Sequence, residues 1–170
     1  AVDNSEVYMT TRLDGPEARF LPFNRGNAGH AGNPANPHGA ATAYLWEEVL
    51  AKDTWLNILG KFMHVQVAKR KDPATGRVSR SSTVIFPRYH QHDAVTTLLA
   101  DAKEKGPGQR YLVQHSAGSG KTNSIAWLSH QLSTLHDADS DKVFDSVLVI
   151  TDRTVLDDQL QDAIYQIDHK

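Results

Sequence analysis

The stretch from Tyr111 to Thr122 constrains the fold more than any other part of the sequence, because it predicts a strand, a glycine loop and a helix in immediate succession. It reads Tyr-Leu-Val-Gln-His-Ser-Ala-Gly-Ser-Gly-Lys-Thr. The apolar run 111–113 is typical of a short strand, and Gly118 and Gly120 permit tight backbone turns before a helix begins. Backbone amides in such a loop and the helix N-terminus attract phosphate oxygens. The stretch therefore predicts a site for a nucleoside triphosphate.

The residues expected to bind this nucleotide lie at the end of the stretch. Lys121 can reach the β and γ phosphates, and the hydroxyl of Thr122 can ligate a Mg²⁺ ion carried by ATP. The most general form of such loops has glycine at position 115, where this chain has His115. The alternative interpretation is a glycine turn that only caps a helix. The predicted cofactors are ATP and Mg²⁺, and the predicted phosphate-binding residues are Gly118, Ser119, Gly120, Lys121 and Thr122.

Composition excludes some classes of function. The 170-residue chain is 39% hydrophobic, and it has no apolar run near the roughly 20 residues that a membrane-spanning helix needs. It has no cysteine, which excludes disulfides and thiolate metal sites and is compatible with the cytoplasm. The formal net charge is -2. This does not favour a strongly basic nucleic-acid module, but a DNA motor needs only local phosphate contacts.

The region 1–86 has the mixed pattern of a small α+β linker or tail. Residues 5–23 predict a hairpin, and the Asn-, Gly- and Pro-rich stretch 24–39 predicts a surface loop. Apolar spacing over 40–62 predicts two short helices, the second with Asp53 as its N-cap. The chain begins with Ala and a strand pattern follows within a few residues, so we expect a segment of a longer protein.

A second hairpin is expected between 63–69 and 78–86, joined by the turn-forming sequence Asp-Pro-Ala-Thr-Gly at 72–76. Its tip is basic, with Lys69, Arg70, Lys71 and Arg77. One interpretation is a solvated turn. The other is a contact with the DNA backbone.

The region 87–170 alternates helical and strand patterns. Helices are predicted at 89–105, after the loop (apolar face Ile125, Leu128, Leu132, Leu135) and at the end of the chain (Leu156, Leu160, Ala163, Ile164, Ile167), and strands at 111–113 and 146–151. The second strand is almost entirely apolar, so we expect it to be buried on both faces. This order predicts an α/β fold in which a parallel sheet is flanked by helices.

Three motifs in a fixed order resemble a known family. They are Arg-Tyr-His-Gln-His-Asp-Ala-Val at 88–95, Gln-His-Ser-Ala-Gly-Ser-Gly-Lys-Thr at 114–122, and Val-Ile-Thr-Asp-Arg-Thr-Val-Leu-Asp-Asp-Gln at 149–159. Together they resemble the start of a superfamily 2 helicase motor, most closely the restriction (R, motor and nuclease) subunit of type I restriction-modification enzymes. The resemblance implies that 87–170 is the N-terminal part of the first RecA-like lobe, and that 1–86 follows a nuclease domain.

The resemblance also implies roles for residues outside the loop. Gln91 matches the glutamine that reads the adenine edge, for which an amide offers one donor and one acceptor; alternatively it is an exposed polar residue on a helix. Thr151 and Arg153 match a motif associated with DNA tracking and would contact backbone phosphate. Asp152 belongs to the same motif, or it only caps the next helix.

The chain lacks several groups that the activity of such a motor requires. No Asp-Glu-x-His stretch follows residue 151 to hold magnesium and position water, and no metal-binding nuclease motif is found. The histidines predict no zinc site. The implied partners are duplex DNA and the methyltransferase and specificity subunits of a restriction complex. Two alternatives stay open, a superfamily 2 remodelling or repair helicase and a non-catalytic assembly or DNA-docking module.

Overall fold

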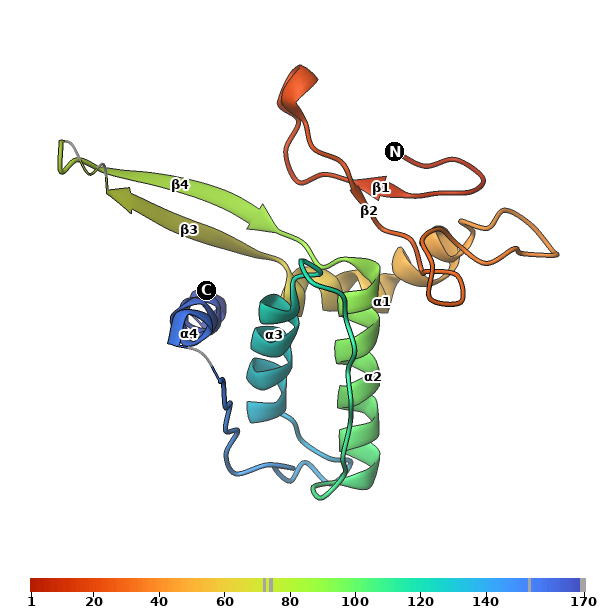
Figure 1. Ribbon diagram of the computed structural model, residues 1–170. Helices are drawn as coiled ribbons and strands as arrows, with labels where there is room; N and C mark the ends of the chain where they lie inside the picture. Colours follow the sequence, from red (N-terminus) through yellow and green to blue (C-terminus); the bar gives the residue numbers. More distant parts are fainter. Residues whose placement is uncertain (72, 74, 153, 169–170) are drawn as a thin grey trace. The chain divides into compact units, whose positions relative to one another are not determined.

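The computed structural model describes residues 1–71, 73, 75–152 and 154–168. The chain divides into two compact units, Ala1–His90 and Gln91–Lys170, and each is described by itself (Figure 1). The prediction that 1–86 is the tail of a nuclease region stays a prediction.

The first unit contains two small antiparallel sheets and a set of short helices. Strand β1 (Tyr8–Met9) pairs with β2 (Leu21–Pro22), which confirms the first hairpin with shorter strands than expected. A 3₁₀ turn, η1 (Gly15–Glu17), lies between them. No helix or strand forms in the described loop 24–39, as expected. The helical segments are η2 (Leu45–Val49), α1 (Lys52–Asn57) and η3 (Ile58–Phe62).

The start of α1 differs from the prediction. Ala51, in an extended conformation with ψ 139°, is the N-cap, and Asp53 lies inside the first turn instead of capping it. An acidic side chain is also favourable in a first turn, because it faces the positive end of the helix dipole. The observed N-cap, Ala51, therefore lies two residues before the predicted one, Asp53.

Aromatic side chains dominate the core of the first unit. Val7, Phe23, Tyr44, Val49 and Ile58 form the buried cluster. Tyr89 packs edge-on against two of them, with ring centroids 5.9 Å from Phe23 and 5.3 Å from Tyr44. Such edge-to-face pairs stabilise a core beyond the area that they bury.

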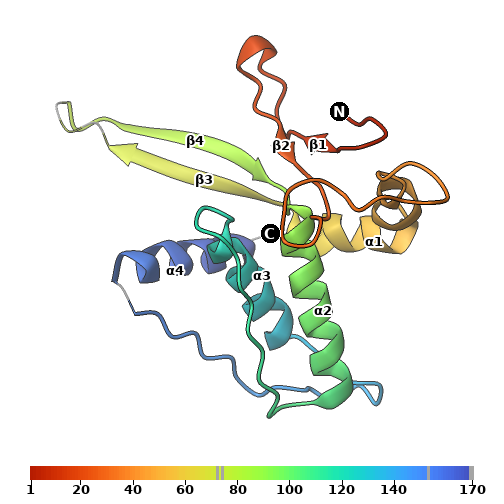
Figure 2. The same ribbon diagram turned by 45° about the vertical axis from the view of Figure 1, so that its right-hand side comes forward.

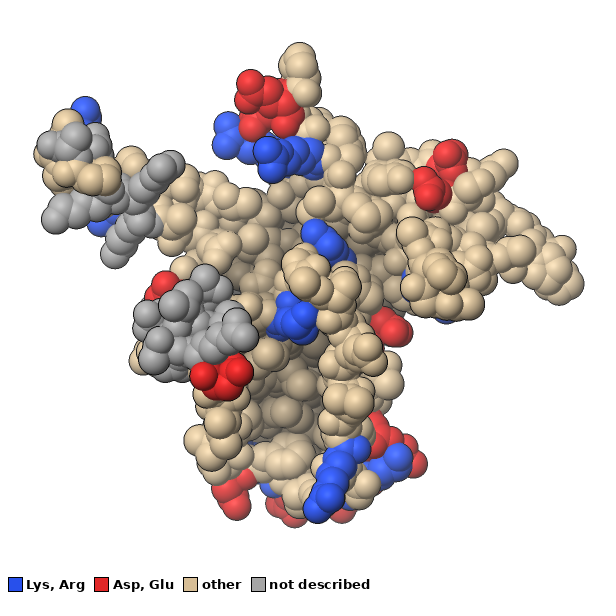
Figure 3. All heavy atoms as spheres, viewed as in Figure 1, with Lys and Arg blue, Asp and Glu red and all other residues tan. Residues whose placement is uncertain are grey.

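The second hairpin forms as predicted. Strand β3 (His64–Lys71) pairs with β4 (Val78–Ile85) along eight residues, from His64 opposite Ile85 to Lys71 opposite Val78. Its base is anchored, since His64 is buried, while seven of the eight residues of β4 are exposed. In Figures 1 and 2 the hairpin extends away from the other elements of its own unit. Figure 3 shows Lys or Arg side chains, and no acidic ones, among the described atoms at its far end.

The second unit contains three helices that match the predicted ones. They are α2 (Tyr89–Lys105), α3 (Lys121–Ser133) and α4 (Thr154–Asp168), and α3 packs against α4. Helix α3 ends at Ser133, so Leu135 lies beyond the face on which it was expected. After α2 the chain turns and runs back along it to the glycine loop (Figures 1 and 2). Among the described residues, no helix is long and apolar enough to cross a membrane.

The two predicted strands of the second unit do not form ladders in the described structure. Segments 111–113 and 146–150 are extended but unpaired, and the only sheets of the described residues are the two antiparallel ones. The expectation that 146–151 is buried on both faces is wrong here, because Leu148 is 83% and Ile150 84% exposed. A strand is buried only when neighbouring strands cover it and satisfy its backbone groups. The parallel sheet therefore stays a proposal.

Candidate nucleotide-binding site

The glycine loop has the backbone conformation that its sequence predicts. Gly118 and Gly120 have positive φ angles of 73° and 82°, in the left-handed region that residues with a Cβ atom rarely adopt. The amide of Ser119 donates to the carbonyl of Ser116 at 3.3 Å, which closes a turn between these two points. Gly120 is the N-cap of α3, so the helix begins at Lys121 as expected.

Gln91 lies against this loop. Its side chain is 3% exposed, which rules out the interpretation as an exposed polar residue. The amide Nε2 donates to the carbonyl oxygen of Gly120 at 2.8 Å. A Cβ atom on Gly120 would approach Nε2 to 2.5 Å, closer than real contacts allow. The backbone conformation thus favours glycine at 120, and a larger residue there would also have to displace the end of the Gln91 side chain.

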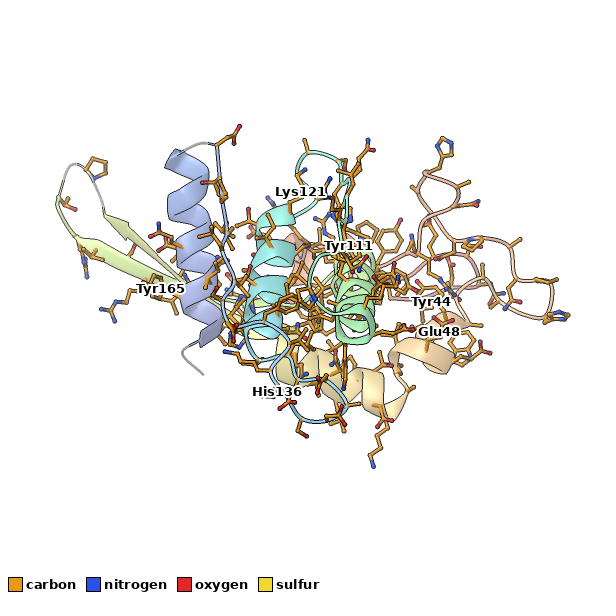
Figure 4. All side chains as sticks on the ribbon, turned by 90° about the horizontal axis from the view of Figure 1, so that it is seen from below. Tyr44, Glu48, Tyr111, Lys121, His136 and Tyr165 are labelled. Atoms are coloured by element: carbon orange, nitrogen blue, oxygen red, sulfur yellow. The ribbon has the colours of Figure 1, made fainter. Side chains whose placement is uncertain are left out.

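Lys121 bends back over the loop. Its Nζ donates to the carbonyl oxygens of His115 at 3.0 Å and Ser116 at 2.9 Å. Figure 4 shows it at the start of α3, beside the loop. The residue is exposed, so its ammonium group combines a fixed position with access from solvent. This is the arrangement in which a lysine can meet an anion at a helix N-terminus.

Two hydroxyl groups lie in the first turn of α3. Thr122 is partly buried directly after Lys121. Ser124 is 9% exposed, and its Oγ has no hydrogen-bond partner in the described structure. The sequence analysis did not single out Ser124, although its position three residues after Lys121 would have placed it on the same helix face. Buried hydroxyls usually have a hydrogen-bond partner in the protein or in ordered water, so the Oγ of Ser124 is available to a further partner.

A cavity of about 120 Å³ adjoins the loop. Its walls are mostly apolar, and Ser124 and Lys121 contribute polar groups. It is much smaller than the roughly 300–1,000 Å³ of typical ligand pockets, so a nucleotide would lie over the exposed face of the loop. The lining residues are Ala94, Val95 and Leu98 of α2, Val113 and His115 of the returning segment, and Lys121, Ser124, Ile125 and Leu128 of α3.

Tyr111 ties the segment that runs back from α2 to the glycine loop, here called the returning segment, to α2 itself. Its hydroxyl donates to Oδ2 of Asp101 at 2.5 Å, and Lys105 pairs with Oδ1 of the same carboxylate at 2.5 Å. The hydrogen bonds from Lys105 and Tyr111 lower the pKa of Asp101, while the carboxylate raises the pKa of Tyr111. Figure 4 shows Tyr111 beside α2. This anchor fixes where the segment starts toward the glycine loop.

The predicted DNA-binding pair is only half described. Thr151 is partly buried at the end of segment 146–151, and Asp152 is exposed after it. Arg153 lies outside the described residues. No contact of Thr151 links it to the glycine loop in the described structure, so the DNA-binding role of both residues stays a prediction.

The loop residues fit the phosphates of ATP. The described residues offer two glycines in left-handed conformation, a helix N-terminus, an exposed lysine and the hydroxyls of Thr122 and Ser124. They contain no group of three His, Asp or Glu side chains that could hold a metal by itself. A Mg²⁺ ion that arrives with the nucleotide would find the hydroxyl of Thr122 as an oxygen ligand.

Residues 90–170 match the family model described as SWI2/SNF2 ATPase. The match contains Gln91, the glycine loop and segment 146–151. No curated protein and no solved structure matches the chain significantly. An ATPase family implies ATP as the nucleotide, usually with Mg²⁺. The family match therefore supports a superfamily 2 helicase-like ATPase over residues 90–170, the class predicted from the glycine loop and its flanking motifs.

Proposed function

We propose that the chain is part of the ATP-dependent motor of a type I restriction enzyme, in the R subunit that translocates and cleaves duplex DNA. The observation that carries the nucleotide-binding half of this proposal is the loop geometry, in which Lys121 and Gly120 are fixed by carbonyl and glutamine contacts. The narrower assignment to the restriction subunit rests on the residues of the three sequence motifs and on their order along the chain.

Within this function, the residues of the glycine loop have distinct roles. Backbone amides of 118–122 and the ammonium of Lys121 bind the phosphates, and Thr122 completes the coordination of Mg²⁺. Bound ATP would supply the β–γ phosphoanhydride bond whose hydrolysis drives the motor. Gln91 orients the loop through its hydrogen bond to Gly120, and its contact with the adenine edge stays a proposal that rests on the motif. The acidic pair and arginine that hydrolysis requires are expected from other segments of the protein.

Binding of ATP to the chain tests the nucleotide site. We expect that Lys121→Ala weakens Mg²⁺·ATP binding by at least tenfold in a calorimetric titration, since it removes the cation that meets the phosphates. Lys103→Ala is the matched control, because Lys103 is an exposed lysine in the last turn of α2. Equal affinity of the Lys121 and Lys103 variants would contradict the proposed site.

The narrower proposal needs the full-length protein. Assembled with methyltransferase and specificity subunits, it is expected to cleave unmethylated duplex DNA only when ATP is present, and Lys121→Ala should abolish both cleavage and translocation. ATP turnover without any cleavage would point to the remodelling or repair helicases instead. ATP binding without turnover would point to a docking module.

A further inference from the structure

We propose that the β3–β4 hairpin is an arm that contacts the phosphate backbone of duplex DNA. This inference rests on the proposed function, since a DNA motor supplies the partner, but it concerns residues outside the ATPase family match. It assigns an interaction surface to the part of the chain that neither the nucleotide site nor the family match explains.

Charge is the first argument. Residues 64–85 contain five Lys or Arg residues and one acidic residue, so the hairpin has a formal charge of +4 in a chain whose net charge is -2. The rest of the chain is therefore negative, at -6. A local positive charge on a negative protein directs a polyanion to one place, because repulsion elsewhere disfavours other contacts.

The register of the strands is the second argument. Lys69 lies directly opposite Arg80. Like charges in directly opposite positions destabilise a two-stranded sheet. A phosphate group bound between these positions would remove that repulsion, so the pairing favours a state in which an anion is present.

Exposure is the third argument. Ser79, Ser81 and Ser82 lie on β4 within the exposed run, so their hydroxyl groups are accessible from solvent next to the cationic end. Serine hydroxyls and arginines commonly donate to phosphate oxygens. A two-stranded ribbon also has the width that the major groove of B-DNA admits, and eight residues span about 26 Å. The hairpin thus has the dimensions, the donors and the charge of a backbone-binding arm.

A different use of the same cations is protection of strand edges. Both strands of an isolated ribbon have an open edge, and exposed Lys or Arg side chains prevent such edges from pairing with other molecules. The exposed apolar side chains of Val65 and Val78, at 55% and 56% exposure, favour such pairing with other molecules. The two roles differ in what happens when the charges are removed, because one predicts lost DNA binding and the other predicts self-association.

The test measures binding of a fluorescent 30-base-pair duplex to the chain by anisotropy at 50–200 mM salt. We compare the parent chain with the double variant Arg77→Gln/Arg80→Gln. The matched control is Lys52→Gln/Lys61→Gln, which removes two exposed cations from α1 and η3 of the same unit. We expect the hairpin variant to bind at least tenfold more weakly at 100 mM salt and the control to bind like the parent. The slope of log K against log salt should fall by about 1–2, since each lost phosphate contact contributes about 0.9.

Several outcomes would overturn the inference. They are an absence of duplex binding by the parent chain, equal affinities of the hairpin and control variants, equal binding of single-stranded DNA of the same length, and displacement of the duplex by poly-glutamate as efficient as by unlabelled duplex. Self-association of the hairpin variant with unchanged DNA affinity would assign the cations to edge protection. Titration of Mg²⁺·ATP in the same samples separates the two proposals, because the hairpin can fail this test while the Lys121-dependent site still binds ATP.

Discussion

The side-chain amide of Gln91 donates to the carbonyl oxygen of Gly120 at 2.8 Å, across 29 positions of sequence. This bond links the first turn of α2 to the N-cap of α3, where the glycine loop ends. The carbonyl of Gly120 also accepts the amides of Asn123 at 3.1 Å and Ser124 at 3.4 Å. One acceptor therefore couples the glutamine of the first motif to the first turn of α3, the helix whose N-terminus is proposed to bind the phosphates.

Substitution of Gln91 should weaken ATP binding through this bond. Gln91→Ala removes one buried hydrogen bond, which is worth about 1 kcal/mol, so we expect roughly fivefold lower affinity for Mg²⁺·ATP. Gln91→Glu should be worse, because a carboxylate cannot donate to the Gly120 carbonyl and repels the phosphates. Calorimetric titration measures both variants. Gln109→Ala, at an exposed glutamine after α2, is the control and should bind like the parent.

Gly120→Ala tests the close approach. The new Cβ atom would lie 2.5 Å from Nε2 of Gln91. The alanine would also have to adopt the left-handed backbone conformation of Gly120, which costs about 1–2 kcal/mol. We expect the free energy of unfolding, measured by urea denaturation, to fall by more than this backbone strain alone. Gly106→Ala is the matched control, since Gly106 has a φ of 70° and nothing within 4 Å of an added Cβ.

The double variant Gln91→Ala/Gly120→Ala separates the two costs. Removing the glutamine side chain relieves the collision but leaves the backbone strain, so the double variant should be less destabilised than the sum of the two single variants. Additive effects would show that Gln91 does not limit the space at Gly120.

Trp127 should be the main anchor of α3. Its side chain is 0% exposed, and truncation of a fully buried tryptophan typically costs about 3–5 kcal/mol. We expect Trp127→Ala to lower the free energy of unfolding of the chain by this amount in urea denaturation. Ile125→Ala, on the same helix at 41% exposure, should cost less than about 1 kcal/mol. Similar losses in both variants would contradict the assigned packing of α3.

Helix α2 shows what the sequence could predict. Its apolar period includes Val95 and Ala102, Pro87 precedes it and Gly106 follows it, and the observed bounds are the predicted ones. These signals are local, since periodicity and helix-stopping residues depend only on neighbours in sequence. The glycine loop was predictable for the same reason, because the φ angles of Gly118 and Gly120 follow from the motif.

Contacts between distant residues were not predictable in the same way. Segment 146–151 has high strand propensity, but a strand also needs partners for its backbone, and those come from elsewhere in a fold. The hydrogen bond from Gln91 to Gly120 depends on how α2 packs beside the loop. The unpartnered hydroxyl of Ser124 likewise depends on packing. In each case the outcome depends on residues that are far away in sequence.

Tyr44 should make the first unit sensitive to alkaline pH. Burial raises the pKa of Tyr44 to about 12, and its hydroxyl donates to the carbonyl oxygen of Phe23 at 2.8 Å. The folded state therefore keeps the proton while the unfolded state loses it above the ordinary pKa of 10.0. The stabilisation is fully present below pH 10 and is lost as the pH rises toward 12.

Replacement by phenylalanine isolates this contribution. Tyr44→Phe loses the hydrogen bond, at about 1 kcal/mol near neutral pH, and has no proton to release, so its unfolding free energy should fall less steeply than that of the parent between pH 10 and 12. Urea denaturation at a series of pH values measures the difference. Tyr165→Phe, at a tyrosine that is 63% exposed, controls for the general effect of alkaline pH. Parallel curves for the parent and the Tyr44→Phe variant would contradict the assignment, because other titrating groups would then account for the whole decline.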